Sequence, residues 1–458
     1  MRGPRRRCYG LPVFLVIGLD CAPPSLVFDR WADHLPHLSA FRARGLWGPL
    51  RSTQPPITVP AWAAMTSGRD PGELGLYGFR NRHRSRDYEL RVATSADVRV
   101  KRVWDRLSES GKRVAALFVP LTSPPTPVRG TMVGCFLGAG DRWAFPPAKQ
   151  RALEARFGSY RRDVADFRTE ELERVLSELD AMREQHFAMA RAVLTEDRPD
   201  FLMMVEMGPD RLHHAMWQHM DPAHRAYRAG NPWEARARDY YVGLDAEVGR
   251  LVAEAGPEAT VLVVSDHGAR AMHGGVALNE HLRAAGWLAL REEPTSPRPL
   301  REVVDWSRTR AWAEGGYYAR VFLNVRGREP QGVVDPAAVP ETLAELERVL
   351  GSLDGVRVDC RRPADVYREV RGEPPELMVY LDDLALRALG TVGHGAVRVP
   401  TNDEGPDGCN HDWDGVAILT GPGIAPGVLD GASILDVAPT VLEHFGVSHD
   451  LPGRSLRR

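Results

Sequence analysis

Aspartate and histidine side chains recur where short apolar runs of this sequence end. Three aspartates occupy such positions, and two of them have a histidine close by in the chain: Asp20, Asp210 with His214, and Asp266 with His267. A lone aspartate after a strand is usually a helix cap, but capping explains three of them poorly. Grouped carboxylates repel one another unless cations neutralise them. Carboxylate and imidazole ligands together suit Zn²⁺, with Mn²⁺ or Fe as alternatives, so the pattern predicts a metal centre.

The spacing within each pair bears on how it could bind a metal. Asp210 and His214 are four residues apart, so on a helix both side chains would lie on one face and could share an ion. A surface ion pair is the alternative for that spacing. Asp266 and His267 are adjacent, and in a strand they would point to opposite faces. Where a strand ends the backbone can turn, and the two side chains could then converge on different sides of a bimetal centre.

A threonine in the segment Thr53–Pro71 adds a hydroxyl group to these candidates. Thr58 precedes a proline-containing turn, and Ala61–Ser67 is predicted as a short helix beginning there. A hydroxyl at a helix N-terminus is often only an N-cap. It can also act as a nucleophile toward a phosphate held at that N-terminus. Coordination to a metal would lower the pKa of the hydroxyl and provide an alkoxide near neutral pH.

These residues need a scaffold whose strands end at one edge. Short runs rich in β-branched residues predict strands at Val13–Leu19, Val114–Val119, Met132–Leu137, Phe201–Val205, Thr260–Val264 and Val416–Leu419. Longer stretches between them predict helices at Glu170–Leu194, Ala235–Ala255 and Val437–Phe445. This alternation predicts an α/β fold with a largely parallel central sheet flanked by helices. Ligand sites of such sheets collect at the carboxyl ends of the strands, where the candidate residues stand.

The texture of the sequence changes between residues 294 and 401, where proline and glycine become frequent. A strand at Tyr317–Asn324, a helix at Glu341–Leu350 and a strand at Leu377–Leu381 predict a smaller α+β subdomain inserted there. The insertion could cap the site or be an elaborated edge of the main domain. Residues 10–293 and 402–458 then form the catalytic core. The polar stretch Gly393–Gly408 is predicted as a surface loop.

Five motifs in order resemble the alkaline phosphatase superfamily, and within it the type I phosphodiesterase/nucleotide pyrophosphatase family. The resemblance spans most of the chain: Val16–Asp20, Pro56–Pro60 with Thr66–Pro71, Asp210–His214, Ser265–Gly268, and His411 with Ala438–Leu442. It implies an alkaline phosphatase-like fold, a two-zinc site and a covalent phospho-threonine intermediate. By position it implies that one ion is held by Asp20, Thr58, Asp266 and His267, and the other by Asp210, His214 and His411. The D-x-x-x-H spacing of the family favours His214 over His213.

Two positions depart from the pattern of the family. Cys21 stands where the family commonly has glycine, and its thiol is either a small neutral group, which we expect, or an additional soft ligand. Ala61-Trp62 stand where many nucleotide pyrophosphatases have Asn-His, which leaves that specificity open. Trp62 either packs against the sheet or offers a surface to an aromatic or apolar substrate moiety. Sulfatases share the fold but need Cys or Ser where this chain has Thr58, so a sulfatase is disfavoured.

The predicted function is a metal-dependent phosphoesterase, first of all a phosphodiesterase, acting on a small-molecule phosphate ester with two divalent ions, Zn²⁺ or Mn²⁺. Three alternatives stay open: a phosphomonoesterase, a phosphotransferase or mutase, and a catalytically silent relative that binds phosphate ligands. A monoesterase or mutase often clamps free phosphate oxygens with cations. Four alternating arginines could form such a clamp or simply a solvated face: Arg80, Arg82, Arg84 and Arg86.

Composition disfavours several other classes of protein. With 43% hydrophobic residues and a net charge of -2, the chain is typical of a soluble globular protein and not of one whose main partner is nucleic acid or an anionic membrane. Five scattered cysteines support neither a disulfide framework nor a zinc knuckle. Arg5–Arg7 before the run Leu11–Leu19 mimics a signal peptide, but the run ends in Asp20 without a cleavage site, so we predict a buried strand and a cytoplasmic protein. No other run is long enough to predict a membrane span.

Overall fold

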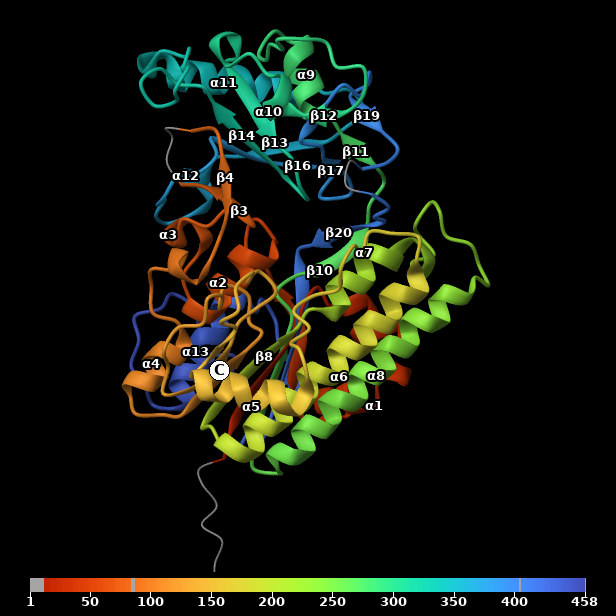
Figure 1. Cartoon of the computed structure of the whole chain (residues 1–458), viewed down its shortest axis with the longest axis vertical. Coiled ribbons are helices and arrows are strands. Elements are labelled where there is room, and N and C mark those ends of the chain that lie inside the picture. The colour runs from red at the N-terminus through yellow and green to blue at the C-terminus, as the bar shows by residue number, and fades with distance from the viewer. Residues whose placement is uncertain (1–11, 84–86, 403–404, 458) are drawn as a thin grey trace, which may run out of the picture.

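The computed structural model describes residues 12–83, 87–402 and 405–457 (Figure 1). The largest sheet in these residues has the strand order β22-β2-β21-β9-β1-β8-β5-β6-β7. In that order the strands are Gly427–Val428, Leu46–Arg51, Asp414–Thr420, Thr260–Val264, Phe14–Leu19, Phe201–Glu206, Val114–Leu117, Gly130–Val133 and Ala144–Phe145. The strands from β9 to β6 run parallel, whereas β21 and β7 run against their neighbours. The prediction of a largely parallel central sheet is therefore confirmed.

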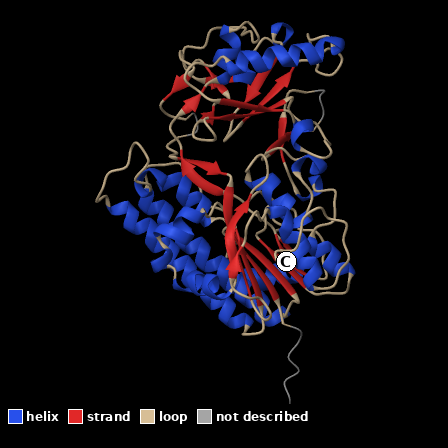
Figure 2. Cartoon of the chain, turned by 180° about the vertical axis from the view of Figure 1, so that it is seen from behind, coloured by secondary structure: helices blue, strands red, loops and turns tan. Residues whose placement is uncertain are grey.

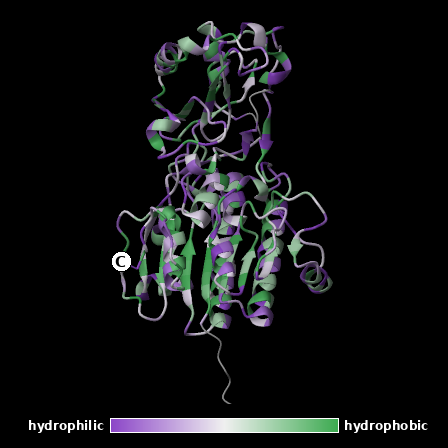
Figure 3. Ribbon diagram, turned by 90° about the vertical axis from the view of Figure 1, so that its left-hand side faces the viewer, coloured by the Kyte–Doolittle hydropathy of each residue, from purple (hydrophilic) through white to green (hydrophobic). Residues whose placement is uncertain are grey.

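Strand β1 occupies the middle of the sheet because its residues are apolar on both faces. Leu15 and Ile17 pack into one buried cluster, whereas Phe14 and Val16 pack into a second cluster on the opposite face. This alternation follows from the two-residue period of a strand. In Figure 3 the strands form a mainly green, hydrophobic layer in the lower part of the molecule. The run that mimicked a signal peptide is thus a core strand in its described part.

Helices cover both faces of the sheet (Figures 1 and 2). The first cluster contains side chains of α1, α6, α7 and α8, which are Pro36–Arg44, Leu172–Asp197, Gly208–Met220 and Pro232–Ala255. The second contains side chains of α2, α4 and α13, which are Thr58–Ser67, Val103–Glu109 and Val437–His444. The core also contains α3 (Pro71–Leu74) and α5 (Pro147–Phe157). The three long helices expected from the sequence begin and end within three residues of the predicted bounds.

Two predicted strands end earlier than the sequence suggested. β5 ends at Leu117, because Phe118 adopts a left-handed φ of 62° that turns the chain. β6 spans Gly130–Val133 and not 132–137, because a turn follows at residues 136–137, closed by the N–H of Gly138, which donates to the carbonyl of Cys135 at 3.1 Å. In both places backbone geometry outside the apolar run decides where the strand stops.

The segment predicted as an insertion carries its own sheet, at the top of Figure 1. Its strand order is β13-β14-β16-β15, with bounds Ala311–Glu314, Ala319–Leu323, Leu377–Leu381 and Val358–Arg361. The amphipathic helix α11 (Val339–Gly351) contributes to the apolar cluster of this sheet. That cluster also includes Val276, Leu282 and Trp287, which precede residue 294. The domain boundaries at 294 and 401 stay a prediction.

Short elements complete the fold. The helices are α9 (Leu278–Ala284), α10 (Leu300–Val303) and α12 (Pro363–Val366). The strand pairs are β3 (Arg80–Arg82) with β4 (Leu90–Val92), β10 (Gly268–Ala271) with β20 (Cys409–Asp412), and β12 (Arg298–Pro299) with β18 (Thr391–Val392). A three-stranded sheet joins β17 (Arg387–Ala388), β11 (Gly275–Val276) and β19 (Arg398–Val399). Within the described ranges, every helix is too short or too polar to cross a membrane.

Candidate active site

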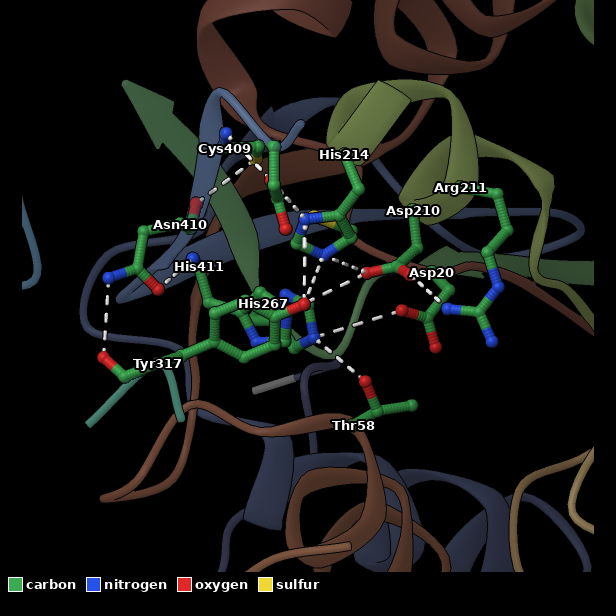
Figure 4. Close-up of polar contacts among 12 residues, drawn as sticks. Asp20, Thr58, Asp210, Arg211, His214, His267, Tyr317, Cys409, Asn410 and His411 are labelled. Carbon is green, nitrogen blue, oxygen red and sulfur yellow. Dashed lines mark hydrogen bonds and ion pairs between the residues drawn. The ribbon is translucent and has the colours of Figure 1, made fainter. Parts of the chain in front are cut away.

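Three neighbouring strands in the middle of the sheet deliver the predicted aspartates to one edge. Asp20 follows β1, Asp266 follows β9, and Asp210 stands near the start of α7, shortly after β8. All seven predicted site residues are at most 2% exposed and meet at this edge: Asp20, Thr58, Asp210, His214, Asp266, His267 and His411. Figure 4 labels all of them except Asp266. The seven residues therefore share a single place in the fold, while the role of each side chain stays a prediction.

The first group of side chains surrounds the imidazole of His267. Its Nε2 atom lies 3.2 Å from the hydroxyl oxygen of Thr58. The same nitrogen lies 3.1 Å from Oδ2 of Asp266 and 3.7 Å from Oδ1 of Asp20. Asp266 and His267 thus converge from adjacent positions where the backbone turns after the strand, but both lie in this one group and not on different sides of a centre.

The second group surrounds Oδ1 of Asp210. Nε2 of His214 lies 3.3 Å from this oxygen, and Nε2 of His411 lies 3.6 Å from it. Because α7 carries Asp210 and His214 one turn apart and both are buried, the alternative of a surface ion pair is wrong. One ligand atom each of Asp20, Asp210 and His267 also lie within 4.8 Å of one another. Asp210 therefore belongs to both groups and stands between them.

Backbone carbonyls fix the orientation of two of the imidazoles. Nδ1 of His411 donates to the carbonyl of Pro56 at 2.8 Å, and Nδ1 of His267 donates to the carbonyl of Gly268 at 3.1 Å. Each Nε2 lone pair is then available to the site. The antiparallel pairing of β10 with β20 places His411 opposite Ala269. The imidazole rings of His267 and His411 stack with their centroids 3.7 Å apart.

The helix that carries Thr58 begins three residues earlier than predicted. Thr58 is the first residue of α2, and Ile57 holds the N-cap position. The side chain of Thr58 caps no backbone N–H, so the N-cap alternative is wrong. Its hydroxyl instead faces His267. A hydroxyl held on a rigid helix beside an imidazole is positioned to act as a nucleophile.

The donor set fits divalent cations. Buried atoms without a hydrogen-bonding partner among the described residues include Oδ1 of Asp20 and Asp210, Oδ2 of Asp266 and Nε2 of His411. Buried polar atoms of this kind are costly unless something binds them. Burial, reinforced by the charges of Asp266 and Asp210, raises the pKa of Asp20 well above its usual range. Burial also lowers the pKa of His267 to about 4, so this imidazole is neutral and able to bind a metal ion.

Both departures from the family pattern have structural explanations. Cys21 adopts a left-handed φ of 63°, the conformation that favours glycine. Its thiol donates to the carbonyl of Gly268 at 3.4 Å. Trp62 is fully buried, and its indole N–H donates to Oδ2 of Asp20 at 2.6 Å. The expectation that Trp62 packs against the sheet is confirmed, and a substrate-facing role is wrong, because a Cβ atom at Gly18 would lie 2.4 Å from its ring.

A polar network behind His214 was missed by the sequence analysis. Nδ1 of His214 bonds to Oδ1 of Asp407 at 3.0 Å, and Nε2 lies 2.9 Å from the hydroxyl of Tyr317. Arg168 donates to both partners, to Asp407 at 2.8 Å and to Tyr317 at 2.6 Å. The carboxylate of Asp407 is fully buried. The prediction of Gly393–Gly408 as a surface loop is therefore wrong at this residue, and no local pattern in the sequence marks it.

A second missed residue follows the predicted ligand Asp210. Arg211 forms a bidentate pair with Asp163, with N–O distances of 2.7 Å, and also donates to Asp210 at 2.5 Å. Burial alone would lower the pKa of Arg211, but these carboxylates raise it above its usual range. His213 turns away from the site, because its Nε2 lies 3.0 Å from the hydroxyl of Tyr241. The preference for His214 over His213 agrees with this geometry.

A cavity of about 620 Å³ opens beside the cluster, and its lining includes Asp210 and His411. The insertion supplies much of the opposite wall, including Tyr317 and Arg320. Of the arginines considered as a clamp, Arg80 lines this cavity, whereas Arg82 is buried against Glu329 at 3.0 Å. Arg84 and Arg86 lie outside the described residues.

Proteins of known structure with the same fold include enzymes named for reactions of phosphorus compounds. Phosphonoacetate hydrolase from Sinorhizobium meliloti 1021, in complex with phosphonoformate, has a TM-score of 0.60 at 16% identity, covering 95% of this chain and 96% of its own. Human ectonucleotide pyrophosphatase/phosphodiesterase 5 has a TM-score of 0.61 at 12% identity, covering 97% of each chain. An inactive variant of the murine protein in complex with AMP has a TM-score of 0.59 at 11% identity, again covering 97% of each chain.

The sequence matches one family model over most of its length. No curated protein sequence matches the chain. The model of the type I phosphodiesterase/nucleotide pyrophosphatase family matches residues 14–405. This range includes six of the seven predicted site residues, all except His411. The α/β fold of the solved structures agrees with this match. The chain therefore belongs to the type I phosphodiesterase/nucleotide pyrophosphatase family and is a phosphoric ester hydrolase.

Proposed function

We propose that the protein is a phosphodiesterase that hydrolyses a small-molecule phosphate ester through a phospho-threonine intermediate on Thr58, with two divalent ions bound. One observation carries the proposal: the hydroxyl of Thr58 lies 3.2 Å from Nε2 of His267, within a buried group of carboxylates and imidazoles. The cavity beside that group provides space for the substrate. Family membership supports the hydrolytic reaction.

Seven residues would hold the ions, in two sets. One set is Asp20, Thr58, Asp266 and His267, and the other is Asp210, His214 and His411. Unpartnered donor atoms occur in both sets, and Asp210 lies within reach of both groups of ligand atoms. When bound, the ions would lower the pKa of a coordinated hydroxyl and neutralise charge on the phosphoryl oxygens. Mixed carboxylate and imidazole ligands favour Zn²⁺, and Mn²⁺ accepts the same donors.

The protein's own residues define the chemical steps. Oγ1 of Thr58 attacks phosphorus, and the bond from phosphorus to the leaving oxygen breaks, so that the alcohol departs with a proton. Water then attacks the phospho-threonine, releases the phosphate product and restores the hydroxyl. Burial keeps His267 neutral, so its Nε2 does not add positive charge next to the nucleophile. The rigid helix α2 keeps the hydroxyl in place through both steps.

The substrate class follows from the family and from its neighbours. Related structures hold AMP and phosphonoformate, and both are small anionic phosphorus compounds. We propose a ligand of comparable size for this cavity. The cytoplasmic location stays a prediction from the sequence.

Paired assays on two chromogenic esters test the reaction class. With Zn²⁺ or Mn²⁺ added, we expect faster release of nitrophenol from bis-p-nitrophenyl phosphate than from p-nitrophenyl phosphate, because a diesterase site accepts a second ester group. Preference for the monoester would overturn the diesterase assignment and favour a phosphatase or mutase. Silence on both esters, with metal bound, would contradict the hydrolytic proposal for these substrate classes.

Replacing Asp407 by asparagine is expected to lower metal affinity and kcat/KM by about 10- to 100-fold. The carboxylate accepts a hydrogen bond from Nδ1 of His214 at 3.0 Å and so orients Nε2 toward Asp210, the position from which it would bind metal. Metal affinity is measured by competition with a chelating dye. Asp383→Asn is the matched control, because Asp383 is half-exposed and pairs with Arg270 and Trp413, not with any of the seven predicted site residues. Unchanged metal affinity in Asp407→Asn would show that Asp407 does not position His214.

A further inference from the structure

The cavity beside the candidate site carries more positive charge than its own carboxylates balance. Six arginines line it: Arg80, Arg168, Arg211, Arg301, Arg320 and Arg387. Two acidic side chains line it, Asp210 and Glu314. A concave, cationic surface of this kind concentrates anions.

Four of these arginines contact carboxylates of the protein itself. The pairs are Arg211 with Asp163, Arg168 and Arg387 with Asp407, and Arg301 with Glu314. Their distances range from 2.7 Å for the first pair to 3.8 Å between Arg387 and Asp407. These ion pairs form part of the cavity wall, and their carboxylates neutralise much of its positive charge.

Arg320 differs from these four. Its side chain is buried, and its guanidinium donates to the backbone carbonyl of Arg80. Within residues 12–83, 87–402 and 405–457, no carboxylate oxygen lies within 4 Å of the guanidinium nitrogens of Arg320. The other guanidinium nitrogens of Arg320 are not among the buried atoms that lack a partner, so they are open to the cavity, where no carboxylate of the described residues balances their charge. The side chain of Arg80 next to it is exposed and adds a second positive charge.

We infer that this end of the cavity is an anion subsite, in which Arg320 and Arg80 bind a second negatively charged group of the substrate. That group is a carboxylate or phosphate carried on the part of the molecule remote from the scissile phosphorus. Guanidinium groups bind both anions through paired hydrogen bonds. The inference rests on the proposed function, because it assumes that the reacting phosphorus occupies the end near Thr58.

The cluster of predicted metal ligands and Arg320 lie close enough in the chain for one small substrate to contact both. The hydroxyl of Tyr317 lies 2.9 Å from His214 in the cluster. Arg320 follows Tyr317 by three residues, so their Cα atoms are separated by no more than about 11 Å. Asp210 and His411 of the cluster line the same cavity as Arg80 and Arg320, so one substrate bound there could contact both groups.

Binding of paired phosphonates tests the subsite without any turnover. The probes are ω-phosphonocarboxylates with two to four methylene groups and alkylphosphonates in which a methyl group replaces the carboxylate. Isothermal titration calorimetry on the zinc-loaded protein should show the best phosphonocarboxylate binding about tenfold more tightly than its partner. Matched α,ω-bisphosphonates show whether the remote group is preferred as a phosphate or as a carboxylate.

Four variants connect that preference to the named arginines. Arg320→Met should reduce the preference to within about twofold of unity, and Arg320→Lys should restore part of it because a charge remains. Arg80→Gln should reduce it several-fold and leaves the carbonyl that Arg320 contacts in place. Arg298→Gln is the control, because it removes the same charge from a partly exposed arginine that is not part of the cavity lining.

The outcomes separate this inference from the proposed function. A wild type without charge preference, or a preference unchanged in Arg320→Met and Arg80→Gln, overturns the subsite. Equal weakening of alkylphosphonates and phosphonocarboxylates in Arg320→Met also overturns it, because Arg320 would then bind the reacting phosphorus group. If Arg320→Met fails to fold, Arg80→Gln decides. A preference for the charged probes without hydrolysis of any ester supports the subsite and contradicts the proposed function. Hydrolysis of an ester without that preference supports the proposed function and contradicts the subsite.

Discussion

Thr58→Ala is expected to lower kcat/KM for phosphate ester hydrolysis by at least about 10³-fold, equivalent to about 4 kcal/mol of transition-state stabilisation. The hydroxyl of Thr58 is the nucleophile of the proposed reaction, and it lies 3.2 Å from His267. Without it, water must attack phosphorus directly, without the geometry that α2 provides. Initial rates on bis-p-nitrophenyl phosphate, with wild type measured beside the variant, give the ratio.

The fold should tolerate this substitution. Thr58 caps no backbone group of α2, and alanine has the higher helix propensity. Circular dichroism and thermal unfolding should therefore match the wild type closely. A loss of activity in a folded variant can then be assigned to the missing hydroxyl.

Two further variants control for position and chemistry. Thr58→Ser keeps a hydroxyl and should retain much of the activity. Thr66→Ala removes a hydroxyl from the same buried helix, where it donates to the carbonyl of Trp62 at 2.7 Å, and should change the rate by only a few-fold. Turnover above a few per cent of wild type in Thr58→Ala would contradict the nucleophile assignment. Phosphate trapped on a residue other than Thr58, detected by mass spectrometry of the quenched reaction, would contradict it independently.

The part of the site that the sequence predicted depends on the ends of central strands. β9, β1 and β8 are continuous apolar runs, so their limits are visible in the sequence. Parallel strands end at one edge, and the residues that follow them, Asp20, Asp210 and Asp266, must therefore lie together. The insertion was visible as a change in composition, and its sheet and helix α11 form close to the predicted segments.

The residues that escaped prediction support the site from irregular segments. Asp407 lies in a turn-rich stretch, and Tyr317 and Arg168 stand outside regular elements. Asp407 and Tyr317 contact His214 directly, whereas Arg168 reaches it only through them, and such contacts between distant segments leave no local period in the sequence. Arg211 follows a predicted ligand, yet only the position of Asp163, 48 residues earlier, shows what it does. Long-range packing of this kind could not be inferred from residue type and spacing.

Removal of the divalent ions is expected to lower turnover by at least about 10³-fold, because the proposed nucleophile would lose its activation. It should also lower the unfolding temperature, since the carboxylates of Asp20, Asp210 and Asp266 share one buried space. Dialysis against a chelator, followed by metal analysis and thermal unfolding, measures both effects. Zinc or manganese added back should restore activity. Full activity in protein shown to hold less than about one-tenth of an ion per chain would contradict a metal-dependent mechanism.

Two neighbouring histidines make the sharpest test of where one ion binds. His213 and His214 are adjacent and equally buried, yet only Nε2 of His214 faces Asp210, at 3.3 Å. His213 bonds to Tyr241, and burial lowers the pKa of His213 to about 3, so it is a neutral core residue. His214→Gln should lose about one ion per chain and at least about 10²-fold in kcat/KM, whereas His213→Gln should keep its ions and lose only stability. Loss of an ion in His213→Gln but not in His214→Gln would assign the metal ligand to His213. That assignment would require the start of α7 to rotate by about 100°.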